Sequence, residues 1–375
     1  MPFISSMQRF WTAYCACAAT LAGVVACAGA TPIAPYQGAQ AEPAATHRAP
    51  APIASVSDAP EPQASASAAA PAASSGAVAS AAPAPSSAGS FPPASFAPPH
   101  ARSAREGDGI WTESAAAGEP GKGAVVQTTV HPHPVNRFVP VQLVAMDLHK
   151  LDLHLSAGTR DPPSDKIPAE RRTGLVPAAD QARLIAVFNG GFQAKHGGHG
   201  MMVQGEVFLP ARDNLCTVAL LRDGGVRIGT WSALQSEQAR YLSWRQSPPC
   251  LLENGEMNPL ARGGDGARKY GMAIDGKMTI RRTALGLDAS GRTLFFGYGE
   301  DVTPALLAEA MKTAGAVDAA QLDINWSYTR FFFYEHPSAG PPVINNSLVP
   351  KLKYDREAYV TKPSGRDFFF VARKP

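Results

Sequence analysis

The segment Phe188-Asn189-Gly190-Gly191-Phe192 places an amide and two adjacent glycines at the end of an apolar run. Glycine tolerates positive φ and close approach by other groups, and an asparagine amide both donates and accepts hydrogen bonds. The same residue types are also typical of a plain tight turn. Taken alone, the sequence leaves two interpretations of this turn, one structural and one as a wall of a binding site.

Two histidines follow in the glycine-rich stretch 196–200, as His196-Gly197-Gly198-His199-Gly200. Zinc proteases place paired histidines on one face of a helix, whereas these glycines predict a loose loop. We therefore interpret His199 as part of a polar loop that lines a cleft, with metal binding as the less favoured alternative. For this reason we expect no metal. We also expect no cofactor, since neither a phosphate-binding loop nor a dinucleotide motif occurs in the chain.

Residues 1–27 are typical of a bacterial lipoprotein signal peptide. Arg9 supplies a positive charge, and residues 11–26 form an apolar stretch that is too short to span a membrane as a helix. The stretch ends in Val24-Val25-Ala26-Cys27, which is similar to the lipobox, where cleavage leaves a cysteine to be acylated. We expect an exported lipoprotein of the cell envelope, anchored through Cys27 on the periplasmic or surface side. An ordinary secretory signal with an incidental cysteine is the alternative.

Composition divides the rest of the chain in two. Residues 28–105 are mostly Ala, Pro and Ser, and such a segment cannot bury enough apolar surface to offset its ordering entropy. We expect a disordered linker there and one large domain over residues 106–375. The formal net charge is only +3 and no basic run occurs, which argues against a nucleic-acid partner. The lipid anchor is the only membrane contact that we expect.

The folded part contains two cysteines, Cys216 and Cys250, whereas Cys15 and Cys17 lie in the expected signal peptide. An oxidising compartment outside the cytoplasm favours one disulfide between two such residues. Two free buried thiols are equally consistent with the sequence.

The pattern of apolar residues predicts an α+β domain with a mixed, largely antiparallel sheet flanked by helices. The clearest helix covers residues 304–314, because Thr303 is a good N-cap, Pro304 fits the first turn and Gly315 can end the helix. A strand at 317–323 follows and carries Asp323 at its end. Residues 161–177 are expected to form a surface loop. Further strands are expected within 139–155, at 184–188, 200–203, 205–208, 216–221, 226–228, 250–252, 271–274, 278–281, 284–287 and 293–297.

Four motifs in this order resemble the phosphodiester glycosidase family, over residues 141–334. The first is the Asn-Gly-Gly-Phe turn at 189–192, and the second is the Pro-x-Leu segment and glycine turn at 247–255. The third is the Arg-Thr-Ala-x-Gly strand at 281–288, and the fourth is the capped helix followed by Leu322-Asp323. The resemblance implies the fold of that family and a hydrolase whose substrate is a glycan or a sugar phosphodiester.

Two positions depart from the family pattern. Where the family commonly has Leu-Asp-Gly-Gly-Gly-Ser-Ser, residues 322–328 read Leu-Asp-Ile-Asn-Trp-Ser-Tyr, so that bulky side chains replace glycines. Where many members have Asp-Gly-Arg, residues 298–300 read Tyr-Gly-Glu. The leading hypothesis is an exported, lipid-anchored phosphodiester glycosidase-like hydrolase that acts on an envelope or environmental glycan. The alternative is a catalytically inactive member that serves as a glycan-binding or envelope-scaffolding lipoprotein.

Glycoside cleavage uses one carboxyl group to protonate the leaving oxygen and another as the nucleophile or to activate water. The candidates for these roles are Asp323, Glu300 and Glu253. A phosphorylated leaving group also needs a fixed cation, for which Arg282 is the candidate, and Asn189 is expected to orient the sugar. The structural alternatives are backbone capping for Asp323, an ion pair for Arg282 and solvated loop charges for both glutamates. The expected substrate-binding set also includes Gly190, Gly191, Thr283, His199, Asn325 and Trp326.

Aromatic residues are dense between residues 326 and 334. Trp326 and Tyr328 are candidates for stacking on a sugar ring. The run 331–334, Phe-Phe-Phe-Tyr, is interpreted instead as a strand that fills the core.

Overall fold

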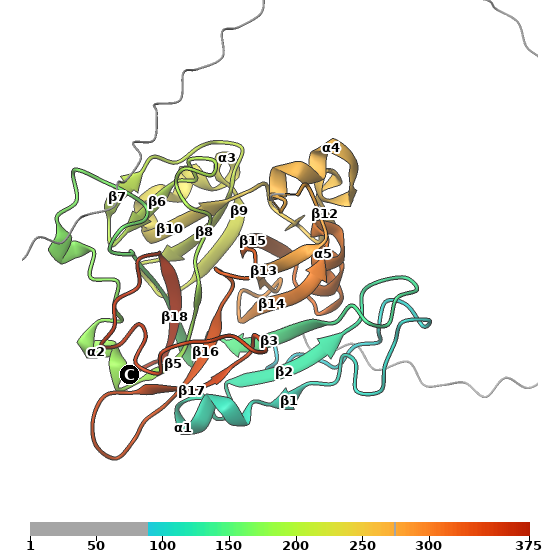
Figure 1. Cartoon of the computed structure of the whole chain (residues 1–375), viewed down its shortest axis with the longest axis horizontal. Helices are drawn as coiled ribbons and strands as arrows, with labels where there is room; N and C mark the ends of the chain where they lie inside the picture. The colour runs from blue at the N-terminus through green and yellow to red at the C-terminus, as the bar shows by residue number, and fades with distance from the viewer. Residues whose placement is uncertain (1–88, 274) are drawn as a thin grey trace, which may run out of the picture. The chain divides into compact units, whose positions relative to one another are not determined.

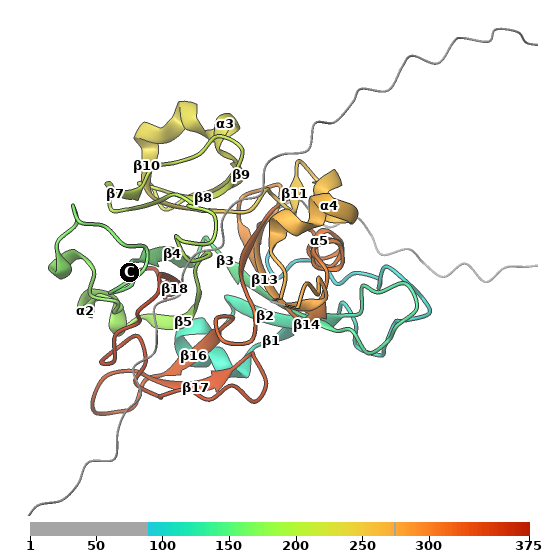
Figure 2. The same cartoon turned by 45° about the horizontal axis from the view of Figure 1, so that its top comes forward.

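The computed structural model describes residues 89–273 and 275–375, and their strands form three sheets (Figures 1 and 2). Every pairing between the named strands is antiparallel. The first sheet has eight strands in the order β1-β2-β3-β14-β13-β15-β11-β12. Their bounds are Thr112–Glu113 (β1), Val125–Val130 (β2), Val141–Asp147 (β3), Thr293–Val302 (β14), Ile280–Leu287 (β13), Asp318–Ile324 (β15), Leu252–Glu253 (β11) and Glu256–Met257 (β12).

The other two sheets have five strands each, in the orders β7-β6-β10-β8-β9 and β17-β16-β5-β18-β4. The second sheet contains Glu206–Leu209 (β7), Met201–Val203 (β6), Tyr241–Ser247 (β10), Cys216–Leu221 (β8) and Val226–Thr230 (β9). The third sheet contains Val343–Ser347 (β17), Phe331–Glu335 (β16), Leu184–Asn189 (β5), Phe368–Arg373 (β18) and Leu151–Ser156 (β4).

The longest helix described, α5 (Pro304–Thr313), lies on the first sheet beside β13 and β14 (Figure 2). The Thr303 hydroxyl accepts a hydrogen bond from the Leu306 amide at 3.3 Å, as expected of an N-cap. Leu307 and Met311 are fully buried on the sheet side, so the predicted helix is confirmed. The other α-helices each span four residues: Gly118–Gly121 (α1), Ala178–Gln181 (α2), Trp231–Leu234 (α3) and Gly264–Ala267 (α4).

The predicted fold class is confirmed, since the described residues form antiparallel sheets with few helices. The structure adds that the strands divide among three sheets. The stretch 139–155 forms two strands in different sheets, because a turn at 148–150 leads the chain from β3 to β4. The predicted strand at 271–274 is wrong for residues 271–273. There Arg282 binds the carbonyl oxygens of Tyr270 and Gly271 and holds this backbone away from any sheet.

Ordered packing begins before the expected domain boundary at residue 106. Phe91 and Phe96 pack against buried residues of the first sheet, and the Phe96 amide donates a hydrogen bond to the carbonyl of Gly109 at 3.1 Å. These two aromatic side chains supply the apolar surface that the preceding Ala-, Pro- and Ser-rich sequence lacks. The expected signal peptide, Cys27 and most of the expected linker lie outside the described residues. Within residues 89–273 and 275–375, no helix is long and apolar enough to cross a membrane.

Cys216 and Cys250 are bonded to each other and connect β8 to the segment that precedes β11, with a Cα–Cα distance of 4.7 Å. Both residues are fully buried. The bond closes a loop in which the two cysteines are 34 residues apart in sequence.

We predict that the variant Cys216→Ala/Cys250→Ala loses about 3–4 kcal/mol of unfolding free energy, because the open chain gains conformational entropy when it unfolds. Urea denaturation of the oxidised wild type and of the variant measures this difference. The wild type under reducing conditions should lose a similar amount. Equal stability of all three samples would contradict the prediction.

Candidate active site

Asp323 lies near the end of β15, directly beside the turn at residues 189–192. The Asp323 amide donates to the Gly190 carbonyl at 3.0 Å. One carboxylate oxygen, Oδ1, accepts from the Ile324 amide at 2.9 Å, and the other, Oδ2, accepts from Arg366 Nη2 at 2.6 Å. Asp323 is only 6% exposed. It is therefore a buried carboxyl group, and Arg366 is the cation that contacts it.

Burial raises the pKa of Asp323 to about 7, because the charged carboxylate has lost most of its water. The neighbouring Arg366 guanidinium and the Ile324 amide favour the charged form and offset only part of this effect. Near neutral pH, Asp323 therefore exists in both its protonated and its ionised form. That property suits a residue that must accept or release a proton.

The two glycines of the turn are required by close approach and not by positive φ. A Cβ on Gly190 would lie 2.0 Å from Oδ2 of Asp367 and 2.8 Å from its carbonyl oxygen. A Cβ on Gly191 would lie 2.8 Å from the guanidinium carbon of Arg245. Neither glycine has positive φ, although both could adopt it. The bare backbone thus makes room for a charged pair.

That pair, Arg245 and Asp367, is almost completely buried, with side chains 1% and 0% exposed. Arg245 Nε lies 2.9 Å from Asp367 Oδ2, which also accepts the Gly191 amide at 3.0 Å. Arg245 further donates to the carbonyl oxygens of Phe192 and His199. The pair therefore ties the second sheet, the glycine turn and the histidine loop to the segment that leads into β18.

Asn189 and Thr283 form a second set of contacts behind Asp323. Asn189 Nδ2 donates to the Thr283 hydroxyl at 3.0 Å, and this hydroxyl donates to the Asp323 carbonyl at 2.8 Å. Asn189 Oδ1 accepts from the Arg330 amide at 3.0 Å. The side chains of Asn189 and Thr283 thus hold the backbone of Arg330 and Asp323 in place. Asn189 lines the smaller of the two cavities described next, and its amide is already engaged in these contacts.

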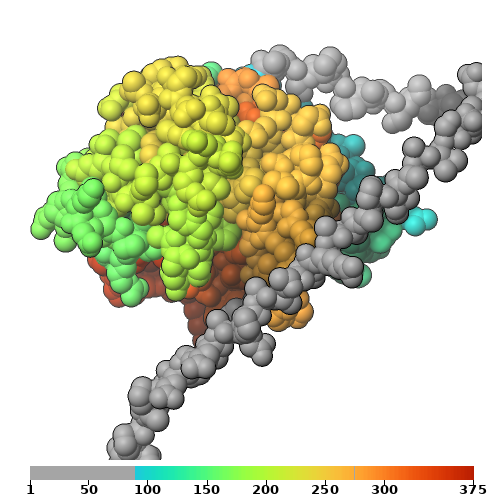
Figure 3. Space-filling view, turned by 90° about the horizontal axis from the view of Figure 1, so that it is seen from above, coloured from blue at the N-terminus to red at the C-terminus, as the bar shows by residue number. Residues whose placement is uncertain are grey.

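Two cavities meet at Asp323. The larger, of about 1020 Å³, is called the aromatic cavity here, because Phe192, His199, Trp326 and Tyr328 are among the residues that line it. The smaller, of about 290 Å³, is called the cationic cavity. The residues common to both are Asp323, Tyr328 and Arg366. In Figure 3, the green-to-yellow atoms of the second sheet lie beside the light-orange atoms of the segment that follows β12.

The cationic cavity carries Arg160, Arg330, Lys362 and Arg366. Of these, Lys362 is paired with Asp355 at 2.6 Å, whereas Arg160 and Arg330 form no ion pair with any described residue. Arg366 lies over the Tyr328 ring at 4.6 Å, and its Nη1 is buried without a hydrogen-bond partner among the described residues. This cavity can therefore hold an anionic group next to Asp323.

His199 is buried, and it lines the aromatic cavity beside the Phe192 ring, with 5.5 Å between ring centroids. Burial, with the nearby Arg245 and Arg212, lowers the pKa of His199 to about 3. The imidazole is therefore neutral at physiological pH and can exchange hydrogen bonds with a polar ligand. Within residues 89–273 and 275–375, no group of three His, Cys, Asp or Glu side chains is arranged to hold a metal ion.

Three residues that we expected at the site lie elsewhere. Arg282 is fully buried, and its donors are taken by Gln321 Oε1 and by the carbonyl oxygens of Tyr270, Gly271, Met278 and Val302. It therefore has no free N–H group for an anion, and the expected clamp role is corrected to a structural one.

The two glutamates also lie apart from Asp323. Glu253 accepts the Thr230 amide at 2.8 Å and lines none of the cavities described here. Glu300 is paired with Arg281 at 2.6 Å in a third cavity. Of the three candidate carboxylates, Asp323 is therefore the one at this site, and the structure does not bring Glu253 or Glu300 to it.

The residues that replace the family's glycines after Asp323 leave the site open. Ile324 packs into a small apolar cluster with Phe192 and Ile280. Asn325 takes the left-handed conformation, with φ of 72°, which asparagine tolerates better than most residues. Trp326 is 74% exposed and lines the aromatic cavity without filling it.

The run 331–334 is buried as a strand, as expected.

Residues 182–340 match the model of the phosphodiester glycosidase family. The resemblance that the motifs predicted is therefore confirmed, and the matched segment of this phosphodiester glycosidase-like domain runs from β5 to β16.

Solved structures with partial similarity include the catalytic domain of zebrafish N-acetylglucosamine-1-phosphodiester alpha-N-acetylglucosaminidase, auto-inhibited by its pro-peptide. It is 14% identical, with 67% of this chain and 84% of that chain covered and a TM-score of 0.43. A hypothetical protein from Synechocystis is 11% identical, with 67% of this chain and 62% of that chain covered and a TM-score of 0.40. No curated protein sequence matches the chain.

Sequence reasoning missed Arg245, Arg366 and Asp367. The last two lie beyond the matched segment, yet Phe368 pairs with Asn189 across the antiparallel strands β18 and β5, which brings residue 367 next to the glycine turn. A signal existed in the sequence, since Arg366-Asp367 is a charged pair directly before the apolar run Phe368-Phe369-Phe370-Val371. Such a pair at the end of a buried strand needs a partner.

We predict that Gly190→Ala lowers the unfolding free energy by about 3 kcal/mol or more, because the new Cβ collides with Asp367 side chain and backbone. Gly229→Ala in β9 is the matched control, since its Cβ would meet only side-chain atoms at 3.5 Å or more. The control should change stability by less than about 1 kcal/mol. Denaturant unfolding of both variants measures the difference, and equal effects would contradict the prediction.

Proposed function

We propose that this chain is an exported, lipid-anchored hydrolase that cleaves the glycosidic bond of a sugar phosphodiester in an envelope or environmental glycan. The observation that carries the proposal is the position of Asp323 and Arg366 on the boundary between the aromatic and the cationic cavity. The phosphodiester glycosidase-like domain supports the reaction class. Export and the anchor rest on the sequence of residues 1–27.

The two cavities suit two chemically different parts of the substrate, the sugar ring and the phosphoryl group. A sugar ring suits the aromatic cavity, where Trp326 and Tyr328 offer aromatic faces and His199 a neutral polar group. A phosphoryl group suits the cationic cavity, where Arg366 and Arg330 present guanidinium groups that match phosphate oxygens. In this arrangement, the bond between sugar and phosphate lies beside the Asp323 carboxyl group.

Asp323 then acts as the general base. Cleavage of the bond between the anomeric carbon and oxygen releases a phosphate monoester, an anion of low basicity that the neighbouring cations stabilise without full protonation. Activation of water is therefore the step that most needs a side chain. The ionised Asp323 accepts a proton from a water molecule that attacks the anomeric carbon. The leaving oxygen keeps the electron pair of the broken bond.

The alternative is a member of this fold that binds glycan without cleaving it. The observation that favours it is that neither Glu253 nor Glu300 joins Asp323. The other two carboxylates of these cavities, Asp367 and Asp275, are each paired with a cation, so Asp323 lacks the second free carboxyl group that most glycosidases use. The two functions differ in one measurable outcome, which is release of free sugar.

We predict that Asp323→Asn reduces release of sugar from a panel of N-acetylglucosamine phosphodiesters by at least about a thousandfold, because the base is lost while the shape is kept. Free sugar is quantified by chromatography. Asp165→Asn, at an exposed residue outside the cavities described here, is the control and should retain activity. A folded wild type that binds glycan but releases no sugar would support the binding function instead.

We predict that kcat/KM of the wild type rises with pH and levels off above about pH 7, since only ionised Asp323 accepts a proton. Arg366→Gln removes the cation that lowers the pKa of this carboxyl group, so the rise should move to higher pH. Rate profiles between pH 4 and 10 measure both midpoints. An activity that falls as the pH passes 7 would assign Asp323 to the acid role.

A further inference from the structure

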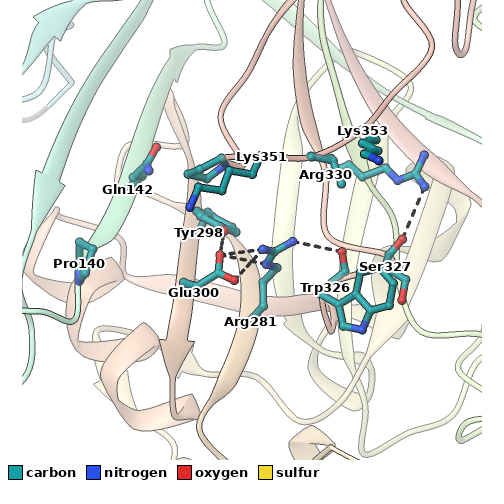
Figure 4. A pocket seen from close by; sticks show the side chains of 12 residues that line it. Pro140, Gln142, Arg281, Tyr298, Glu300, Trp326, Ser327, Arg330, Lys351 and Lys353 are labelled. Carbon is teal, nitrogen blue, oxygen red and sulfur yellow. Dashed lines mark hydrogen bonds and ion pairs between the residues drawn. The ribbon is translucent and has the colours of Figure 1, made fainter.

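A third cavity, of about 800 Å³, adjoins both cavities of the proposed active site and is called the lysine cavity here (Figure 4). We propose that it is a subsite for a further anionic group on the same glycan. The substrate would then be a chain with repeated negative charges and not a single sugar phosphodiester. This inference rests on the proposed function for the position of the cleaved bond.

The charges in this cavity favour an anion. Arg281, Arg330, Lys351 and Lys353 line it, whereas Glu300 is the only carboxylate among its lining residues. Glu300 is already neutralised by Arg281, through contacts of 2.6 and 2.8 Å to Nη2. Within the described residues, neither lysine forms an ion pair. The cavity therefore presents unneutralised positive charge.

The contacts of Glu300 explain why it belongs to the framework of this cavity. It accepts hydrogen bonds from Arg281 and from the Tyr298 hydroxyl (Figure 4). Arg281 in turn donates to the Trp326 carbonyl at 3.1 Å. This chain of contacts holds Trp326 at the edge of the cavity, and it leaves Glu300 no role as a free acid.

The loop between β15 and β16 connects the three cavities. Trp326 and Ser327 line both the lysine cavity and the aromatic cavity. Arg330 lines both the lysine cavity and the cationic cavity. A glycan that stacks on the exposed Trp326 ring can thus continue from the active site into the lysine cavity without leaving the surface.

The backbone at Lys351 is a separate observation. Lys351 has φ of 56°, a left-handed conformation that is unfavourable for a lysine in a surface turn. It lies with Lys353 on the wall that faces Arg281 and Trp326 (Figure 4). Strained backbone that directs a charged side chain to a cavity is typical of binding sites.

The test compares a defined oligomer of four sugar-phosphate repeats with the single sugar phosphodiester. Binding is measured by calorimetry on the full chain carrying Asp323→Asn, so that turnover does not interfere. We expect the oligomer to bind about tenfold more tightly than the single unit, because added anionic groups reach the lysine cavity. A tetramer of a uronic acid and a neutral chitin tetramer show whether charge is the property that is recognised.

The variant Lys351→Asn/Lys353→Gln, made in the same background, removes both lysine charges from the cavity, and asparagine tolerates the left-handed conformation at residue 351. We expect it to lose the tenfold preference and to leave binding of the single unit unchanged. Lys166→Gln/Lys312→Gln is the control, since both lysines are outside the cavities described here and carry the same charge. The control should bind the oligomer as the parent does.

The outcomes separate this inference from the proposed function. Hydrolysis of the single unit by the wild type, without any preference for an oligomer, overturns the inference and leaves the proposed function intact. Equal binding of the neutral and the charged tetramers also overturns it. Charge-dependent binding that the lysine variant loses, in a wild type that releases no sugar, supports the inference and contradicts hydrolysis.

Discussion

The candidate site depends on the buried ion pair between Arg245 and Asp367. Removing two charges from water is costly unless geometry and hydrogen bonds compensate, and here both partners are saturated. Asp367 binds the Gly191 amide, and Arg245 binds carbonyl oxygens of the glycine turn and the histidine loop. Because Arg366 precedes Asp367 in the chain, fixing the pair also fixes the arginine that reaches Asp323. The geometry of the candidate site follows from this contact between distant segments.

Local patterns in the sequence predicted much of the fold. The helix after Thr303 carries its own start and stop signals. The strands that deliver Asn189 and Asp323 are largely apolar, with the polar residue at the last position of β5 and at the last position but one of β15. The position of Asp323 beside the Asn-Gly-Gly turn follows from the order of the family's motifs. These features depend on neighbours in sequence or on a known pattern, so the chain alone contains them.

The partners of the charged residues could not be predicted in this way. Arg282 stands in a family motif, and nothing in its local sequence shows that loop carbonyl oxygens occupy its donors. Arg366 and Asp367 lie 43 and 44 residues after Asp323 in the printed sequence, and only the pairing of β18 with β5 brings them to the site. Long-range pairing of this kind is set by the packing of the whole domain. Local patterns and motifs in the sequence do not reveal it.

Asp147 shows by contrast why Asp323 is a poor structural residue and a good functional one. Both carboxyl groups are buried, and burial alone raises the pKa of each. At Asp147, two hydrogen bonds from Arg292 and one from the His149 amide outweigh burial, so its pKa is lowered. At Asp323, one hydrogen bond from Arg366 and one from the Ile324 amide do not outweigh burial, and the pKa rises from 3.8 to about 7.

The sign of the two shifts gives opposite consequences for stability. Because folded Asp323 holds its proton more tightly than the unfolded chain does, its stabilising effect is present below about pH 3.8 and is lost as the pH rises to about 7. Asp147 stabilises the fold in its ionised form, and this effect is lost as the pH falls through its lowered pKa. Near neutral pH, Asp323 therefore costs stability where Asp147 adds it. A fold that retains such a carboxyl group between two cavities gives up stability at this position, as expected of a residue with the proton-transfer role that we propose for Asp323.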